Sequence, residues 1–325
     1  MSWLLEIENL ETRFKIAKGT VHAVNGVSLK MQRRETVGIV GESGCGKSVT
    51  MLSILGLLPQ PPAMITANKV EFDGKDLLHY SAEELRGIRG DRVSMIFQDP
   101  MTSFNPVLTV GRQLMEPLEM HTDKGQKESE ELAREMLALV GIPNPKQRLS
   151  DYPHQFSGGM RQRLMIAMAL ICDPELLIAD EPTTALDVTI QAQIIDLVTR
   201  LKDRMKMSVI WISHDLAVVA GIADRVIVMY GGTIVEEAQI DMLYENPRHP
   251  YTIGLLNSLP KGVDNEKRLL PIGGMPPILM EKPKLCPFFD RCEFAQRCNH
   301  DEPPPLIQIN EQHRVACWLQ MDDAQ

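Results

Sequence analysis

GESGCGKS, residues 41–48, is the stretch of sequence that decides the fold. It follows the apolar run TVGIV and precedes SVTMLSILGLL, so a buried strand is expected to lead through this loop into a helix. Glycines let backbone N–H groups close around a phosphate, and the dipole of the following helix favours an anion there. The spacing and its context predict a phosphate-binding loop, with Lys47 on the β- and γ-phosphates and Ser48 on Mg²⁺.

Every residue of the loop is a candidate nucleotide contact, mostly through its backbone. Cys45 occupies a variable position and is expected to contribute only its backbone N–H. The candidate contacts are Gly41, Glu42, Ser43, Gly44, Cys45, Gly46, Lys47, Ser48 and Val49.

A second apolar run, LLIA at residues 176–179, is followed by two acidic residues, Asp180 and Glu181. Hydrolysis of a nucleotide needs one carboxylate to hold Mg²⁺ and another to polarise the attacking water. Downstream of a phosphate loop, Asp180 suits the first role and Glu181 the second.

Charge and hydropathy limit the classes of function. The 325 residues carry a net charge of −9, which argues against a nucleic-acid partner, because such binding needs a basic face. The sequence has no apolar run close to the roughly 18 residues of a membrane-spanning helix. The start, MSWLLEIENLETRFK, lacks the basic residues of a secretory signal, so we expect a protein of the cytosol whose membrane association comes through a partner.

The pattern of elements changes along the chain. Short alternating runs near 3–40 are typical of strands, and KVEFDGKDLL predicts a hairpin that turns at Asp73-Gly74. Residues 99–155 have a helical period, in which Leu132, Met136 and Leu139 mark the expected apolar face. Helices and strands then alternate to about 240, which favours an α/β core with a parallel sheet. The tail beyond 260 is rich in Pro and Cys and is expected to bury little apolar surface.

The family is indicated by further motifs, which occur in order. FSGGM at residues 156–160 resembles the signature motif of ATP-binding-cassette (ABC) ATPases, and TALD at residues 184–187 resembles their D-loop. IFQDP at residues 96–100 is similar to their Q-loop, and SHD at residues 213–215 to their switch histidine. On these residues the chain is identified as a member of the ABC ATPases, over residues 1 to about 240.

The resemblance implies a fold and a division of the chain. The fold class is α/β: a P-loop NTPase core with a parallel sheet, an antiparallel β subdomain, a helical subdomain and a small Cys-rich C-terminal extension. Residues 1–98 and 156–240 would form the ATPase core, residues 99–155 the helical subdomain, and residues 241–325 the extension.

The resemblance also implies roles for single residues. His214 would contact the γ-phosphate, and Gln98 would sense Mg²⁺ and the attacking water. Each ATP would be sandwiched between two chains, with the signature of one chain on the γ-phosphate held by the other. The signature residues concerned are Ser157, Gly158 and Gly159, and Asp187 would cross the dimer interface.

The sequence departs from the family pattern at three places. Met160 replaces the usual glutamine and Phe156 the usual leucine, so the signature is expected to contact the partner's ATP differently. The aromatic residue that stacks on adenine in many relatives is not evident near Lys18; Phe14 and His22 are candidates, and His22 is preferred.

YPHQFS at residues 152–157 and NPRHPYT at residues 246–252 resemble the ATPases of peptide/nickel importers. That family implies a second homologous ATPase, two transmembrane permease subunits and an extracytoplasmic peptide-binding protein, with this chain peripheral on the cytoplasmic face. The cargo would be oligopeptides or dipeptides, with nickel chelates as the alternative. The ATPase does not touch cargo, so the cargo class follows from ancestry alone.

A group of cysteines closes the sequence, and its spacing fits neither zinc pairs nor the bacterial ferredoxin run. From resemblance to some importers we favour a [4Fe–4S] cluster, with Zn²⁺ or reduced thiols as alternatives, and a role in stapling the tail. The candidate ligands are Cys286, Cys292, Cys298 and Cys317.

Two other functions remain open from the sequence. A soluble ABC ATPase that remodels nucleic acid or ribosomes would commonly carry two cassettes or a coiled insert, and this chain has neither. A redox-sensing module would change its ATPase activity when the cluster is oxidised.

Overall fold

The structure is a computed structural model that describes residues 2–99, 103–184, 186–259, 272–298 and 301–321. The chain forms two compact units, Met1–His79 with Ile212–Gln325, and Tyr80–Trp211. Strand β9, Ser208–Ser213, crosses the boundary between them. The three-part division expected from the sequence stays a prediction.

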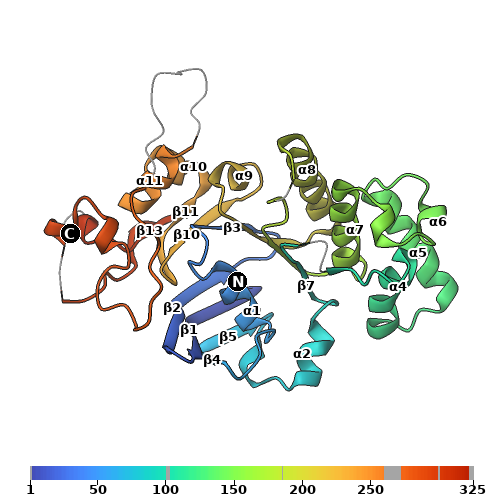
Figure 1. The fold of residues 1–325 in the computed structure, drawn as a ribbon, viewed down its shortest axis with the longest axis horizontal. Helices are drawn as coiled ribbons and strands as arrows, with labels where there is room; N and C mark the ends of the chain where they lie inside the picture. Colours follow the sequence, from blue (N-terminus) through green and yellow to red (C-terminus); the bar gives the residue numbers. More distant parts are fainter. Residues whose placement is uncertain (1, 100–102, 185, 260–271, 299–300, 322–325) are drawn as a thin grey trace. The chain divides into compact units, whose positions relative to one another are not determined.

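The first unit contains an antiparallel sheet in its N-terminal part (Figure 1, blue to cyan). Its order is β2-β1-β5-β6, and β4 also pairs with β1. Asp73 and Gly74 turn β5 into β6 with positive φ angles of 52° and 73°, so the predicted Asp-Gly hairpin is confirmed. The strands are β1 (Leu5–Ile16), β2 (Gly19–Met31), β4 (Ala63–Thr66), β5 (Lys69–Phe72) and β6 (Lys75–Asp76).

A second run of strands in this unit has the order β12-β13-β11-β10-β3. β10 lies parallel to β3, and β13 pairs antiparallel with β11. The tail therefore adds strands to the core, and it buries a few apolar side chains there, among them Phe288 at 3% exposed and Val315 at 0%. The strands are β3 (Thr36–Val40), β10 (Arg225–Tyr230), β11 (Thr233–Gln239), β12 (Ile307–Asn310) and β13 (His313–Val315).

Short helices accompany these strands. α1 ends at Ile54, earlier than its apolar run suggested, because Gly56 turns the chain with a φ of 60°. The helices of this unit are α1 (Lys47–Ile54), α9 (Leu216–Ala220), α10 (Ile240–Glu245) and α11 (Pro250–Asn257), with the 3₁₀ turns η1 (Leu77–His79), η3 (Phe289–Arg291), η4 (Ala295–Arg297) and η5 (Trp318–Gln320).

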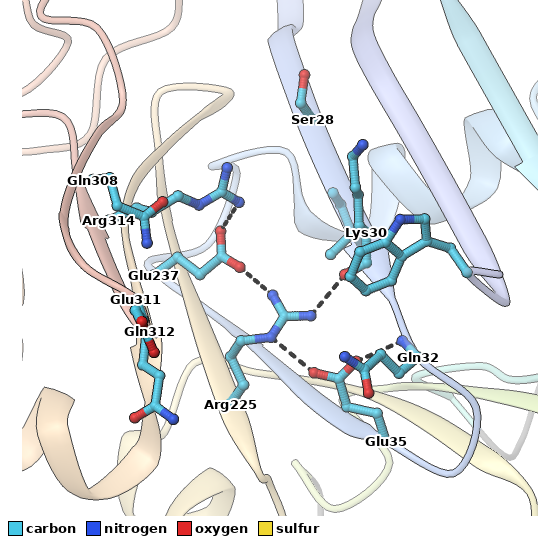
Figure 2. Close-up of a pocket in the computed structure, with 12 residues that line it drawn as sticks. Ser28, Lys30, Gln32, Glu35, Arg225, Glu237, Gln308, Glu311, Gln312 and Arg314 are labelled. Carbon is cyan, nitrogen blue, oxygen red and sulfur yellow. Dashed lines mark hydrogen bonds and ion pairs between the residues drawn. The ribbon is translucent and has the colours of Figure 1, made fainter. Parts of the chain in front are cut away.

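A cavity of about 370 Å³ in this unit is lined by a charged network (Figure 2). The Arg225 guanidinium donates to Glu35 Oε1 at 2.8 Å and to the Lys30 carbonyl at 2.8 Å, and it also pairs with Glu237. Arg314, on β13, pairs with the same Glu237. Each arginine on this wall therefore has a carboxylate partner, which suits a structural link between tail and core.

The second unit is mainly helical, and α4, α5 and α7 pack together. Its strands β7 and β8 pair in parallel. The helical character expected near 99–155 is confirmed in the described residues. The elements are α2 (Ala82–Ile88), β7 (Val93–Ile96), α4 (Val110–His121), α5 (Gln126–Leu139), α6 (Pro145–Arg148), η2 (Pro153–Gln155), α7 (Gly158–Leu170), β8 (Leu176–Asp180) and α8 (Val188–Met205).

Candidate nucleotide site

The phosphate loop lies between the fully buried strand β3 and helix α1. Two of its glycines are required by close backbone contacts. A Cβ on Gly41 would lie 2.2 Å from the Met229 carbonyl oxygen, and one on Gly46 would lie 2.5 Å from that of Ala23. Gly44 faces open space with a φ of +80°, so only its backbone conformation favours glycine. Strand backbones therefore fix both ends of the loop, and its middle is accessible.

Lys47 begins helix α1 and is only 4% exposed. Its ammonium donates to the carbonyls of Gly41 at 2.7 Å and Glu42 at 3.0 Å, and it lies 3.8 Å from Cys45 Sγ. Burial raises the pKa of the Cys45 thiol, which stays protonated despite this neighbouring charge. The ammonium is thus held inside the curve of the loop, where an anion would meet it.

Glu42 connects the loop to the C-terminal extension. Its carboxylate forms a two-point ion pair with Arg291, at 2.5 Å and 3.0 Å. Its backbone N–H donates to the Tyr251 hydroxyl at 2.8 Å. Tyr251 belongs to the NPRHPYT motif at residues 246–252, and Arg291 precedes Cys292 in the tail. Nothing in the sequence around either residue identifies Glu42 as its partner.

In the second unit, β8 ends at Asp180, which is 6% exposed, and Glu181 follows with a positive φ of 47°. A non-glycine residue with positive φ is uncommon and often marks a functional site. The Glu181 carboxylate accepts from Thr184 Oγ1 at 2.9 Å and from Gln98 Nε2 at 3.3 Å. The predicted base and the predicted water-sensing glutamine are therefore neighbours.

The signature motif forms the N-terminus of α7. Ser157 is the N-cap, and its hydroxyl accepts from the Met160 N–H at 3.4 Å. Ser157 and Gly158 are exposed, which leaves this helix end accessible to an anion. Phe156 is 2% exposed, so its side chain belongs to the interior of this unit. The change from leucine at this position is therefore a packing difference within the unit.

The D-loop aspartate caps the next helix. Asp187 Oδ1 accepts from the Ile190 N–H at 2.9 Å. Beside it, Val188 is 83% exposed, which is unusual for so apolar a side chain. Pro100 of the Q-loop and Ala185 of the D-loop lie outside the described residues.

Two histidines complete the predicted set. His214 is exposed directly after β9, before the helix capped by Asp215. His22 lies on β2, where its backbone N–H donates to the Leu279 carbonyl at 2.8 Å. The extension therefore also borders the position proposed for adenine.

The tail cysteines are close enough to influence one another. Burial, with a smaller contribution from the neighbouring tail thiols, raises the pKa of Cys286 to about 12 and that of Cys317 to about 11. The thiols are therefore neutral near pH 7. Across the described ranges, no group of three or more His, Cys, Asp or Glu side chains is arranged to hold a metal ion.

Comparison with known proteins places these features in a family. The ABC transporter family model matches residues 24–184, and the model for the oligopeptide/dipeptide transporter C-terminal region matches residues 235–298. The dipeptide transport ATP-binding protein DppD of Bacillus subtilis is 52% identical, over 98% of this chain and 96% of its own. The chain belongs to the ABC transporter ATP-binding proteins.

Other relatives agree with this assignment. The oligopeptide transport ATP-binding protein OppD of Bacillus subtilis is 48% identical over 99% of this chain and 90% of its own. An ATP-binding cassette solved as a dimer in a post-hydrolysis state, with ADP and Pi, has a TM-score of 0.65 at 27% identity and covers 73% of this chain and 98% of its own. This ABC protein is an ATP-hydrolysing transporter subunit with the P-loop NTPase fold. In its described residues, no helix is long and apolar enough to cross a membrane.

Proposed function

We propose that this ABC protein is one of two different ATPases that energise import of oligopeptides or dipeptides. The observation that carries the proposal is the joining of the cassette to the oligopeptide/dipeptide C-terminal region in one chain. The relatives named for dipeptide and oligopeptide transport align along nearly the whole chain, which supports the same assignment. Two permease subunits would supply the path across the membrane, and an extracytoplasmic protein would deliver the peptide. The chain would lie on the cytoplasmic face.

In this proposal each nucleotide contact has a physical reason. Lys47 would neutralise charge on the β- and γ-phosphates, and Ser48, Gln98 and Asp180 would hold Mg²⁺. Glu181 polarises the water that attacks the γ-phosphorus, which releases ADP and phosphate. Gln98, which donates to Glu181 at 3.3 Å, orients the same water. His214 contacts the γ-phosphate.

The second ATPase would complete each site. The exposed N-terminus of α7, with Ser157 and Gly159, would bind the γ-phosphate held by the partner. Asp187 and the exposed Val188 would lie in the interface between the two cassettes. ATP would close this heterodimer because its γ-phosphate adds contacts that ADP lacks, and hydrolysis would reopen it.

We further propose that the tail cysteines hold a [4Fe–4S] cluster. What supports this proposal is the chemistry of the four thiols, which suits iron–sulfur ligation, and the family resemblance; the described side chains would have to move closer together to bind the cluster. The bound group would staple the tail. Iron and sulfide analysis of the anaerobically purified chain tests this, with Cys172→Ser as the matched control. Iron retained in Cys286→Ser would contradict the ligand assignment.

The experiment for the main proposal measures ATPase activity in three states. The chain is assayed alone, then in a complex with the permeases and second ATPase in vesicles, and then with peptide-loaded binding protein. We expect stimulation only in the full complex, together with uptake of labelled peptide. If the isolated chain has full ATPase activity that its partners do not change, the importer proposal is contradicted. If the complex takes up a nickel chelate and no peptide, the proposed peptide cargo is contradicted.

A further inference from the structure

Two residues of the C-terminal extension hold the same residue of the phosphate loop. Arg291 donates through both terminal nitrogens to the two carboxylate oxygens of Glu42, at 2.5 Å and 3.0 Å. Tyr251 accepts the Glu42 backbone N–H through its hydroxyl at 2.8 Å. The Arg291 side chain is 6% exposed and that of Glu42 27%, so water screens this pair only partly.

Both of these residues are themselves fixed. Arg291 also donates to the carbonyls of Gly273 at 2.7 Å and Ile272 at 3.2 Å, and to the Tyr230 hydroxyl at 3.1 Å. The Tyr251 ring is fully buried, with its centroid 4.6 Å from that of Tyr230. A guanidinium with this many partners and a buried ring have few alternative conformations. The extension therefore presents a rigid surface to the loop.

This rigid surface acts on the part of the loop that meets the nucleotide. Glu42 accepts a hydrogen bond from the Lys47 ammonium through its carbonyl oxygen at 3.0 Å. Its peptide N–H and carboxylate are held by the extension, which limits the conformations of the residue that carries this carbonyl. Gly44 faces open space two residues later, so neighbouring atoms restrict the loop little at that point.

We propose that Arg291 and Tyr251 are positioning residues for ATP binding, and that the extension braces the phosphate loop through Glu42. This inference rests on the nucleotide role proposed for the loop. A braced loop has already lost the conformational freedom that an unbraced loop would lose on binding ATP. Removing the brace therefore weakens nucleotide binding, although neither residue touches the phosphates. It leaves the rate of the chemical step unchanged, because the carboxylate base lies on a different segment.

The test compares MgATP binding and turnover in full-length variants. We expect Arg291→Gln to weaken MgATP binding about tenfold by calorimetry, as a loss of one charged hydrogen-bonded pair would produce. Arg291→Lys should recover part of this loss, because it keeps the charge without the fork. Tyr251→Phe removes only the acceptor and should weaken binding less than Arg291→Gln. In the complex, KM should rise by the same factor as the dissociation constant while kcat stays unchanged.

The control is Arg297→Gln, an exposed arginine of the same tail, which should leave binding unchanged within about twofold. A double-mutant cycle adds Glu42→Gln: if the pair acts as a unit, the double variant binds as weakly as Arg291→Gln alone. If Arg291→Gln does not fold, MgATP binding by the single variants Tyr251→Phe and Glu42→Gln tests the brace instead.

The outcomes separate this inference from the proposed function. A wild-type chain that fails to bind MgATP would contradict the proposed role of the loop. A wild-type chain that binds, with Arg291→Gln and Tyr251→Phe binding equally well, would overturn the brace alone. The brace would also be overturned if these variants lowered the melting temperature without weakening MgATP binding, since this is the effect expected of a purely structural contact.

Discussion

We predict that the buried side chain of His249 makes the folded chain less stable in mild acid. The ring is buried, and burial lowers its pKa from 6.5 to about 4, while nearby Glu236 opposes the shift. Its Nδ1 accepts the Tyr251 N–H at 3.1 Å, so protonation there would break the cap of α11. Between pH 6.5 and 4 the unfolded chain binds the proton and the folded chain does not. Stability therefore falls as the pH falls through this window, by up to about 3 kcal/mol.

At pH 5 the expected loss is about 2 kcal/mol, which corresponds to roughly 4 °C in the melting temperature. The measurement is the melting temperature of the full chain at pH 7 and pH 5. Other carboxylates titrate in the same range, so the matched control is His249→Asn, which keeps a side-chain acceptor at the cap and does not titrate. The wild type should lose about 4 °C more than the variant between the two pH values. Equal losses in both proteins would refute the reasoning.

Three further predictions concern the nucleotide site. Glu181→Gln should retain ATP binding, trap the closed dimer and lower ATP turnover in the complex about 100-fold or more. Normal turnover in this variant would show that another group polarises the water. Gly46→Ala should lower the free energy of unfolding by about 3 kcal/mol, because its Cβ would lie 2.5 Å from the Ala23 carbonyl oxygen, whereas Gly44→Ala should lower it by about 1 kcal/mol. Equal urea midpoints for the two variants would contradict this prediction. Asp187→Ala should remove the N-cap of α8 and about 1 kcal/mol of stability, whereas Asp187→Asn should keep the cap. Both variants should impair ATP turnover, and a fully active Asp187→Asn variant would show that the negative charge of Asp187 is not needed.

The main elements of the core could be predicted because local rules decide them. The apolar run LLIA forms the buried strand β8, which ends at Asp180, and Asp-Gly supplies the positive φ angles of the β5–β6 turn. Helix α5 lies in the region where a helical period was predicted, but its most buried residues differ from the predicted apolar face. Ala133 and Leu137 are fully buried, whereas Leu132 is only half-buried. Apolar residues flank this face on both sides, so the helical period alone does not decide which of two neighbouring residues points toward the core.

The candidate site was predicted where neighbours in sequence become neighbours in space. Lys47 and Gly41 belong to one motif, and their contact follows from its geometry. Gln98 and Glu181 are 83 residues apart, and the sequence assigned both to the attacking water without predicting the hydrogen bond between them. The partnership of Glu42 with Arg291 had no such signal, because many carboxylates and arginines of the chain could pair equally well. Packing of the tail on the core selects that one pair.

The order of synthesis gives the brace a further consequence. Tyr251 and Arg291 follow Glu42 by 209 and 249 residues, so a growing chain makes the phosphate loop long before the residues that hold it. At about 5–20 residues per second, the delay is on the order of ten to fifty seconds. During that interval the loop is synthesised but unbraced. ATP would therefore be captured firmly only by chains whose extension has been made and has folded onto the core, which ties nucleotide loading to completion of the subunit.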